Sequence, residues 1–507
     1  MRYGFVIDHR RCIGCHACTV ACKEENRVPL GAFRTWVKYV EKGTFPDTRR
    51  YFSVLRCNHC DEAPCVTICP TVALYRRPDG IVDFDGRRCI GCKSCMQACP
   101  YDALYIDPTT NTAAKCHYCA HRLEVGLEPA CVIVCPERAI IAGDLDDPRT
   151  EIARLVAREQ VEVRKPEQGT RPKVFYVGAD SSALTPPLQR PAATFMFGQR
   201  PAAEADLVQM VAALHAREAG PDGALSRPVY DAPHAARPWG GRVAAYLWTK
   251  SIAAGALLVA AFGSLEPLYT VAAPALSLLF LLLTTVLLVF DLKRPDRFAY
   301  ILLKPNPRSW LVWGAWILMA FGLAGAVWLL GGLTGRYGII GLIAVPTIVL
   351  ALAAAGYSAF LFGQAEGRDF WQSPLVLPHL LVSAVVAGTA SLLVAAVVLA
   401  QPGAAQLGQI LAVALVLHVA LLGLDLFSRH PVRDVALAAR LITHGAYRGR
   451  FWIGVVAAGV LVPVMLLAVG AGPSLGVLPA LAALLALAGL WLWEDLWVKA
   501  GQSVPLS

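Results

Sequence analysis

One run of cysteines constrains this chain more than any other feature. Residues 89–100 read CIGCKSCMQACP, which is the spacing C-x2-C-x2-C-x3-C followed by proline. In this pattern three cysteines of a tight loop bind one [4Fe–4S] cluster, and the fourth binds a different cluster. The short gaps let three thiolates converge on one cubane, and the proline ends the loop. The run therefore predicts iron–sulfur clusters in more than one site.

Three further blocks repeat or vary this spacing, and the four blocks contain all 16 cysteines. The first block repeats the spacing, the second has a longer middle gap, and the fourth carries an insertion before its third cysteine. The blocks are Cys12, Cys15, Cys18 and Cys22; Cys57, Cys60, Cys65 and Cys69; Cys89, Cys92, Cys95 and Cys99; and Cys116, Cys119, Cys131 and Cys135. At four ligands for each cubane, they predict four [4Fe–4S] clusters.

The blocks are expected to pair as in an internally repeated ferredoxin, where the fourth cysteine of a block crosses to the neighbouring cluster. The first block then shares two clusters with the fourth block, and the second block with the third. The predicted ligand sets are Cys12, Cys15, Cys18 and Cys135 (site 1); Cys22, Cys116, Cys119 and Cys131 (site 2); Cys57, Cys60, Cys65 and Cys99 (site 3); and Cys69, Cys89, Cys92 and Cys95 (site 4).

Disulfides and structural zinc fit these cysteines less well. A disulfide framework is typical of short secreted chains, whereas this chain is long and opens with MRYGF, without an apolar signal segment. Structural zinc accepts paired C-x2-C units, but it requires neither a third cysteine two residues on nor the closing Cys-Pro. Iron–sulfur clusters are the preferred interpretation, with zinc as the alternative.

The composition separates the chain into two parts. Of its 507 residues, 56% are hydrophobic and 16% charged, which is too apolar for an ordinary soluble protein. Residues 1–235 are polar and hold every cysteine, whereas residues 240–498 form a succession of long apolar runs. We therefore expect an α+β double ferredoxin-like four-cluster head joined to an all-α eight-helix transmembrane bundle. The net charge of +9 forms no basic stripe with interleaved aromatics, so nucleic acid is not an expected partner.

The predicted domains are a cluster-binding head (1–142), a connector (143–236) and a membrane domain (237–507). In the connector, residues 173–177 predict a strand, and residues 204–217 predict an amphipathic helix. The apolar runs lie near 243–263, 271–290, 310–331, 339–363, 377–400, 407–427, 451–470 and 475–498, each about long enough to span a bilayer. Tryptophans near the run ends are typical of an aromatic belt, namely Trp239, Trp248, Trp310, Trp313, Trp371, Trp452 and Trp497.

These motifs suggest a family. With its four cysteine blocks and the segment KPEQGTRPKVFY (165–176), the head resembles the four-cluster electron-transfer subunit of molybdenum or tungsten oxidoreductases related to dimethyl sulfoxide and polysulfide reductase. The body is similar to the NrfD-type quinone-reactive membrane subunit of polysulfide reductase. That similarity is carried by YLWTKS (246–251), DLKRPDRF (291–298), KPNPRSW (304–310) and AGQSVPL (500–506). The family usually carries these parts as two polypeptides, which are fused here.

The resemblance implies a chain of redox centres. A separate catalytic subunit with a bis-pterin molybdenum or tungsten centre would dock on the head. Electrons would pass along the clusters to or from a quinone in the membrane, either menaquinone or ubiquinone. By this resemblance site 1 lies nearest the catalytic subunit and site 4 nearest the quinone. The protein would then be the subunit without the catalytic centre in a membrane-bound, quinone-dependent oxidoreductase.

Polar residues within the apolar runs are candidates for the quinone site, because ionisable groups in lipid are costly. They gather at the run ends that face the head, where Glu366 also lies, and Tyr357, Lys250 and His379 are the strongest candidates. The expected quinone contacts are Tyr246, Lys250, Asp291, Arg294, Tyr357, Gln364 and His379. For each one alone, the alternative is an interfacial anchor or a snorkelling side chain.

His379 and His418 lie on neighbouring runs, which raises the question of a haem. His379 opens its run, whereas His418 is well inside its own, so the two are expected at different depths. Bis-histidine ligation requires matched depths, and no haem is expected. A hydrogen-bonded structural role inside the bundle is the expectation for His418.

The expected location is the cell (inner) membrane, with the head on the cytoplasmic face and the periplasmic face as the alternative. Short loops rich in Lys and Arg stay in the cytoplasm. The head-side loops carry Lys293, Arg294, Arg297, Lys304, Arg308, Arg429, Arg433, Arg440, Arg448 and Arg450, whereas on the opposite side only Arg336 stands out. Arg10 and Arg11 are followed by a cysteine block and not by an apolar segment, so they do not form a twin-arginine export signal.

Two other function classes stay open at this point. One is an ion-translocating membrane subunit, and the other is a passive membrane anchor for the head. The sequence does not select the partner's substrate, the direction of electron flow or the quinone type.

Overall fold

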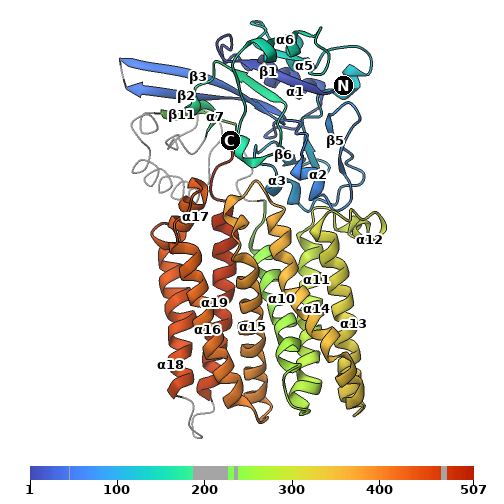
Figure 1. The fold of residues 1–507 in the computed structure, drawn as a ribbon, viewed down its shortest axis with the longest axis vertical. Helices are drawn as coiled ribbons and strands as arrows, with labels where there is room; N and C mark the ends of the chain where they lie inside the picture. Colours follow the sequence, from blue (N-terminus) through green and yellow to red (C-terminus); the bar gives the residue numbers. More distant parts are fainter. Residues whose placement is uncertain (45, 186–225, 233–237, 470–476) are drawn as a thin grey trace.

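The computed structural model describes residues 1–44, 46–185, 226–232, 238–469 and 477–507. It shows a head of strands and short helices seated on one end of a helical bundle (Figure 1). The two-part fold that the sequence predicts is confirmed. The helix predicted over 204–217 lies outside the described residues.

A four-stranded sheet forms the centre of the head, in the order β8-β1-β10-β9. β1 (Tyr3–Asp8) pairs antiparallel with β8 (Ile140–Asp144) and parallel with β10 (Val174–Val177), which in turn pairs with β9 (Val161–Glu162). Helix α6 (Glu151–Arg158) covers this sheet through the buried Ile152. The predicted strand at 173–177 therefore exists, and it belongs to the central sheet of the head.

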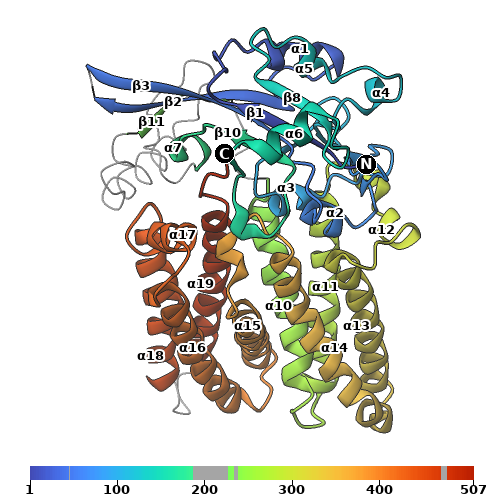
Figure 2. The ribbon, with the colours of Figure 1, turned by 45° about the horizontal axis from the view of Figure 1, so that its top comes forward.

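A long ribbon projects from this sheet (Figure 2). It consists of β2 (Thr35–Thr44) and β3 (Asp47–Arg56), and β11 (Ser226–Tyr230) pairs with the outer edge of β2. The remaining strands form two small hairpins, β4 (Leu74–Arg76) with β5 (Val82–Phe84), and β6 (Leu104–Ile106) with β7 (Ala113–Lys115). The described parts of the predicted connector thus contribute strands to the sheets of the head.

Short helices follow the first cysteines of the blocks. These helices are α1 (Ala17–Glu25), α2 (Pro64–Thr67), α3 (Ser94–Ala98), α4 (Ala120–Leu123) and α5 (Ala130–Ile133). α1 packs against α5, and α2 packs against α3. The first block therefore lies beside the fourth, and the second beside the third.

Eight helices are long and apolar enough to cross a membrane among the described residues, as predicted. They are α10 (Gly241–Ala260), η3 with α11 (Leu268–Asp291), α13 (Trp310–Leu333), α14 (Tyr337–Gly363), α15 (Val376–Val398), α16 (Ala404–Phe427), η6 with α18 (Arg450–Val469) and α19 (Val477–Gly501). The protein is a multi-pass membrane protein.

α10 is the central helix of the bundle and contacts α11, α14, α15 and α19. It meets α15 where Gly255 faces Gly388, and a Cβ atom on either glycine would collide with the backbone of the other helix. Small residues at such a crossing let two membrane helices approach closely. The same device recurs where Gly459 of η6 meets Gly489 of α19.

The loops between head and bundle contain η4 (Pro295–Arg297), α12 (Tyr300–Leu303), η5 (Asp369–Gln372) and α17 (Arg433–Thr443). The chain then ends between the two parts, as Figure 1 shows. The main-chain carbonyl of Leu506 there accepts a hydrogen bond from the buried Arg164 of the head (2.8 Å). Head and body therefore share a bonded interface.

Candidate functional site

The four cysteine loops share one backbone device. The residue before the second cysteine has positive φ in every block: Gly14 (72°), His59 (46°), Gly91 (68°) and Tyr118 (63°). This left-handed conformation turns the loop tightly enough to bring neighbouring thiols to one side, and it costs glycine least. Blocks two and four use His59 and Tyr118 instead, whose rings pack edge to face at 5.4 Å.

The structure gathers the cysteines in the predicted combinations. Three small cavities are each lined by four cysteines: those of site 2, those of site 3 and those of site 4. At site 1, Cys12 lies close to Cys15, Cys18 and Cys135. Within the described part of the chain, no three His, Cys, Asp or Glu side chains converge as the ligands of a single metal ion do. Thiols placed around a cavity fit a polynuclear cluster better than a lone zinc ion.

The sites follow one another in a line. Cys18 of site 1 is near Cys131 of site 2, and Cys116 of site 2 is near Cys57 of site 3. Cys65 of site 3 is in turn near Cys95 of site 4. The order 1, 2, 3, 4 comes from this geometry, because the spacing of the cysteines contains no such information.

Backbone amides already point at several sulfur atoms. Gly91 N and Ala113 N donate to Cys89 Sγ (3.4 and 3.3 Å), and Ala139 N donates to Cys135 Sγ (3.3 Å). Such donors favour the thiolate form. Burial acts the other way and raises the pKa of Cys116 to about 12. The thiolates that an iron–sulfur cluster needs therefore require positive charge nearby.

Two fully buried cations supply this charge. Arg56 Nη1 donates to Cys131 Sγ (3.2 Å), while its Nε and Nη2 have no hydrogen-bond partner among the described residues. Lys115 Nζ donates to Cys116 O (2.8 Å) and to Val82 O, and lies 3.6 Å from Cys57 Sγ. Burial lowers the pKa of Arg56, but the thiolates of Cys131, Cys116 and Cys18 raise it further. A buried guanidinium with orphaned N–H groups fits a site that holds an anionic cluster.

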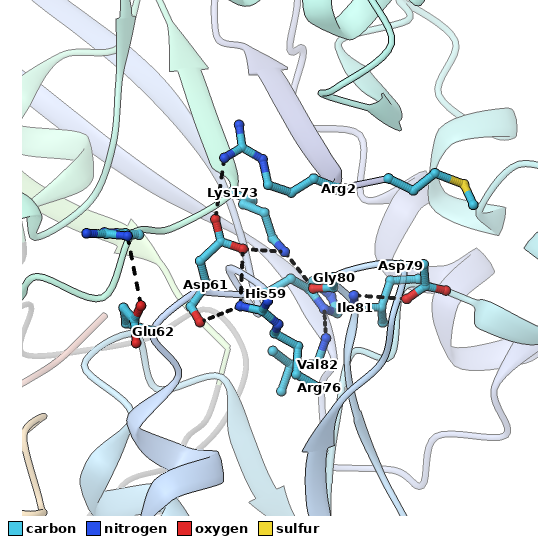
Figure 3. A network of polar contacts seen from close by, with 12 residues as sticks. Arg2, His59, Asp61, Glu62, Arg76, Asp79, Gly80, Ile81, Val82 and Lys173 are labelled. Atoms are coloured by element: carbon cyan, nitrogen blue, oxygen red, sulfur yellow. Dashed lines mark hydrogen bonds and ion pairs between the residues drawn. The ribbon is translucent and has the colours of Figure 1, made fainter.

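Figure 3 shows a third buried cation with a different environment. Lys173 donates to Gly80 O (2.5 Å) and pairs with the carboxylate of Asp61 at 3.1 Å. Asp61 is also approached by Arg2 (3.7 Å) and Arg76 (3.8 Å). Lys173 is therefore neutralised locally, in contrast to Arg56 and Lys115.

His59 lies in the same region and adds no charge to it. Its Nδ1 accepts a hydrogen bond from Val82 N at 3.3 Å. Burial and the neighbouring Lys115 lower the pKa of His59 well below its usual value. The imidazole is therefore neutral.

Site 4 lies directly against the membrane domain. Asn306 Nδ2 donates to Cys69 O (2.8 Å), and Trp239 Nε1 donates to Cys92 O (3.2 Å). Ser309 Oγ donates to Ile68 O (2.7 Å). The segment KPNPRSW, which carries part of the family resemblance, therefore holds the cysteine loop that lies closest to the bundle.

Below site 4, polar side chains from three helices meet inside the bundle. Lys250 Nζ of α10 donates to Ala355 O and Ser358 Oγ of α14 (both 2.8 Å), and it lies 4.8 Å from the centre of the Tyr357 ring. Tyr246 also lies beside Ser358. Glu494 of α19 is buried next to Lys250, and within the described ranges its Oε1 has no hydrogen-bond partner. The structure thus brings Tyr246, Lys250 and Tyr357 together.

Four other residues at the same membrane face have different partners. Asp291 forms an ion pair with Lys93 of the head at 2.8 Å. Arg294 pairs with Asp296 at 2.8 Å on the surface, and Gln364 bonds to Trp310 N (2.9 Å) and Arg308 O (2.6 Å). Glu366 is half-buried beyond the end of α14, and burial raises its pKa. Asp291 joins head to body, and Gln364 caps α13.

His379 belongs to a second cluster. Its Nε2 lies 3.9 Å from Asp425 Oδ2, and its ring centre lies 6.2 Å from that of His418. The two rings thus lie near each other, and the expectation that the histidines lie at different depths stays a prediction. His418 has no hydrogen-bond partner for either ring nitrogen, so its expected structural hydrogen bond is absent from the described residues. The expectation of no haem stays a prediction.

Sequence reasoning missed several residues of these sites. Glu494 and Asp425 are carboxylates inside apolar runs, a signal that could have singled them out. Arg56 and Lys115 each directly precede a cysteine block, which is a weaker signal.

Comparison with known proteins bears on both parts. Residues 232–505 match the family model "Polysulphide reductase, NrfD". Residues 48–145 match "4Fe-4S dicluster domain", and residues 10–26 match "4Fe-4S binding domain". The resemblance found for each part of the sequence is thereby confirmed.

Individual relatives match the head. It is similar to the B subunit of tetrathionate reductase from Salmonella typhimurium, with 49% identity over 193 residues, or 37% of this chain and 77% of that protein. The B chain of polysulfide reductase from Wolinella succinogenes is 42% identical over 181 residues, which is 35% of this chain and 94% of that protein. The arsenate respiratory reductase iron-sulfur subunit ArrB of a Shewanella species is 35% identical over 225 residues, which is 35% of this chain and 96% of that protein.

Proposed function

We propose that this protein transfers electrons between a separate catalytic subunit and membrane quinone. The protein belongs to the polysulphide reductase NrfD family and carries a 4Fe-4S dicluster domain in its head. Sites 1 to 4 would each hold one [4Fe–4S] cluster through their four thiolates. Bound there, the clusters would supply one-electron redox chemistry, and this chain would hold them in line and exclude water from them.

The contact between site 4 and the membrane domain carries this proposal. The loop of Cys69 is bonded to Asn306, and that of Cys92 to Trp239, with no other domain between them. Electrons that reach site 4 therefore arrive at the face of the bundle. A passive anchor needs neither this contact nor a buried group of ionisable side chains beneath it.

The proposed quinone contacts are Tyr246, Lys250 and Tyr357, and we propose Glu494 as a further member because it is buried beside Lys250. A quinone that takes up two electrons also takes up two protons, so its site needs hydrogen-bond donors for the carbonyls and a route for protons. Lys250 and Tyr357 supply donors, and Glu494, buried beside Lys250, can exchange a proton. Asp291 also lies near Tyr246 and remains a candidate, as does His379 of the second cluster.

Re-oxidation of the reduced protein by a soluble quinone tests the proposal. The purified full-length chain is reduced chemically, and the visible absorbance of its clusters is followed after mixing with quinone. Tyr357→Phe and Lys250→Met should slow this reaction at least about tenfold, while re-oxidation by a hydrophilic dye stays unchanged. Tyr269→Phe and Lys304→Met are matched controls, because Tyr269 lies near the far end of the bundle and Lys304 is exposed in the loop before α13. If quinone re-oxidises all four variants at the wild-type rate, Tyr357 and Lys250 do not belong to the quinone site.

The catalytic partner is proposed to be a molybdenum or tungsten bis-pterin subunit that docks over site 1. Cys15 is exposed there, together with the apolar side chains of Ile13 and Val20. An exposed apolar surface beside the first redox site suits a partner protein. The named relatives belong to tetrathionate, polysulfide and arsenate reductases, so they do not select one substrate.

The head is proposed to face the cytoplasm. Arg429, Arg440, Arg448 and Arg450 lie exposed at the head-side end of the bundle, whereas Arg297 donates to Gly86 O of the head (2.7 Å). Arginines in short loops favour the cytoplasmic side.

A further inference from the structure

Arg56 and Lys115 occupy special positions in the line of sites. Arg56 ends β3 between sites 1 and 2, where it donates to Cys131 Sγ at 3.2 Å and lies near Cys18. Lys115 ends β7 between sites 2 and 3, where it bonds to Cys116 O and lies 3.6 Å from Cys57 Sγ. Both side chains are at most 1% exposed. Site 2 is therefore contacted by both cations.

Neither cation has a carboxylate within ion-pair distance among the described residues. The charge of Asp83 acts on Lys115, but Asp83 is itself paired with Arg77 at 3.6 Å. The Arg56 guanidinium stacks on Phe5 at 4.4 Å, and two of its nitrogens have no hydrogen-bond partner in the part of the chain that the structure describes. By contrast, Lys173 is paired with Asp61, as Figure 3 shows, and Lys93 at site 4 is paired with Asp291.

A buried charge without a counter-ion is strongly destabilising. The charges of opposite sign within reach of Arg56 are the thiolates of sites 1 and 2, and those within reach of Lys115 are the thiolates of sites 2 and 3. A cluster with four thiolates is anionic, and it becomes more negative when it takes up an electron. A fixed cation in a low-dielectric surrounding therefore favours the reduced form.

We propose that Arg56 and Lys115 set the reduction potentials of the head, and that together they make site 2 the member of the line with the highest potential. This proposal rests on the proposed function, because it requires clusters in the four sites. Site 2 would hold an electron most readily and would separate the partner-facing site 1 from the quinone-facing sites 3 and 4. Both residues act through the clusters and are positioning residues.

Redox titration of the purified full-length protein, followed by electron paramagnetic resonance, tests the proposal. The variants are Arg56→Gln and Lys115→Gln, with the charge-retaining Arg56→Lys and Lys115→Arg beside them. The highest midpoint potential should fall in both Gln variants. In each variant the equilibrium constant for reduction should fall about tenfold or more, which corresponds to about 59 mV for one electron. A second midpoint should fall with Arg56→Gln only, a third with Lys115→Gln only, and the fourth should not move. The charge-retaining variants should stay close to the wild type.

Arg11→Gln is the matched control, because Arg11 also directly precedes a cysteine block but is exposed to solvent, which screens its charge. Equal shifts in Arg11→Gln and Arg56→Gln, or unmoved potentials in both buried variants, would overturn the proposal. Iron and sulfide analysis is done on every variant. If a Gln variant loses its clusters while the charge-retaining variant keeps them, the requirement for a counter-charge at that position is supported. The shift in midpoint potential is then measured on the other Gln variant. If both the Gln variant and the charge-retaining variant at one position lose their clusters, the role of that residue is purely steric, and the assignment for it is refuted.

These outcomes are distinct from a failure of the proposed function. If the wild-type protein contained no iron and no acid-labile sulfide after anaerobic preparation, the function itself would be refuted. If it contained four clusters whose potentials ignore both substitutions, only the present inference would fail.

Discussion

The junction between head and membrane domain is held by a buried polar network whose energetics can be tested. Arg368 is 7% exposed, and it donates through Nε to Gln97 Oε1 (3.0 Å) and through Nη1 to Val504 O (3.1 Å). Gln97 lies between Cys95 and Cys99, and its Nε2 donates to Gln502 Oε1 (2.6 Å). One network therefore connects the loop of sites 3 and 4 to the C-terminal tail.

Two substitutions should have unequal costs. Arg368→Met orphans two buried acceptors, each worth about 1–3 kcal/mol. It also removes a buried charge, and burial lowers the pKa of Arg368, so part of this cost is recovered. We expect a loss of about 2 kcal/mol in the free energy of unfolding, near the lower end of the sum. Gln97→Leu leaves the charged guanidinium buried without its Nε acceptor, which costs about 3 kcal/mol or more, because an unsatisfied charged group exceeds the usual range of about 1–3 kcal/mol.

Equilibrium unfolding by dodecyl sulfate in mixed micelles measures both losses. Tryptophan fluorescence follows the unfolding, and two of the 12 tryptophans, Trp239 and Trp371, stack at 5.5 Å beside this network. The double variant should cost less than the sum of the single variants by about 0.5–3 kcal/mol. Arg171→Met, at an exposed ion pair, is the control and should cost less than about 1 kcal/mol. An Arg368→Met loss larger than that of Gln97→Leu, or strict additivity, would refute the reasoning.

Three further predictions concern cofactor content, packing and topology. Anaerobically purified protein should contain about 16 iron atoms and as many acid-labile sulfides, four of each for every four cysteines, and little zinc; zinc in place of iron would contradict this. Gly388→Ala should cost at least about 1–3 kcal/mol, because its Cβ atom meets the backbone at Gly255, whereas Gly423→Ala, with open space around it, should cost nothing measurable by thermal unfolding in detergent. In right-side-out spheroplasts, external protease should leave the head intact, and cleavage without lysis would place the head in the periplasm.

The parts of the fold that local sequence determines could be predicted. A C-x2-C loop is a local structure, and an apolar run of bilayer length forms a helix whatever it packs against, so the cysteine blocks and the eight spans needed no partner to be recognised. Pairing between distant strands is different. The strand at 174–177 was predictable from its composition, but its place beside β1 was not, because that register depends on residues more than 160 positions away. The same limit applies to β11, which pairs with β2.

The basic residues beside the cysteine blocks show why the sequence alone does not identify the functional residues. A basic residue directly precedes the first cysteine of every block: Arg11, Arg56, Arg88 and Lys115. As a pattern, these four are equivalent. In the fold, Arg11 points to solvent and Arg88 is half-buried, whereas Arg56 and Lys115 end strands that run between two sites and are therefore buried against thiols of both. The same residue type beside the same motif is thus a solvated charge in one block and an uncompensated interior charge in another. Because the Coulomb energy depends on dielectric surroundings far more than on sequence position, only the packing of β3 and β7 distinguishes the two cases.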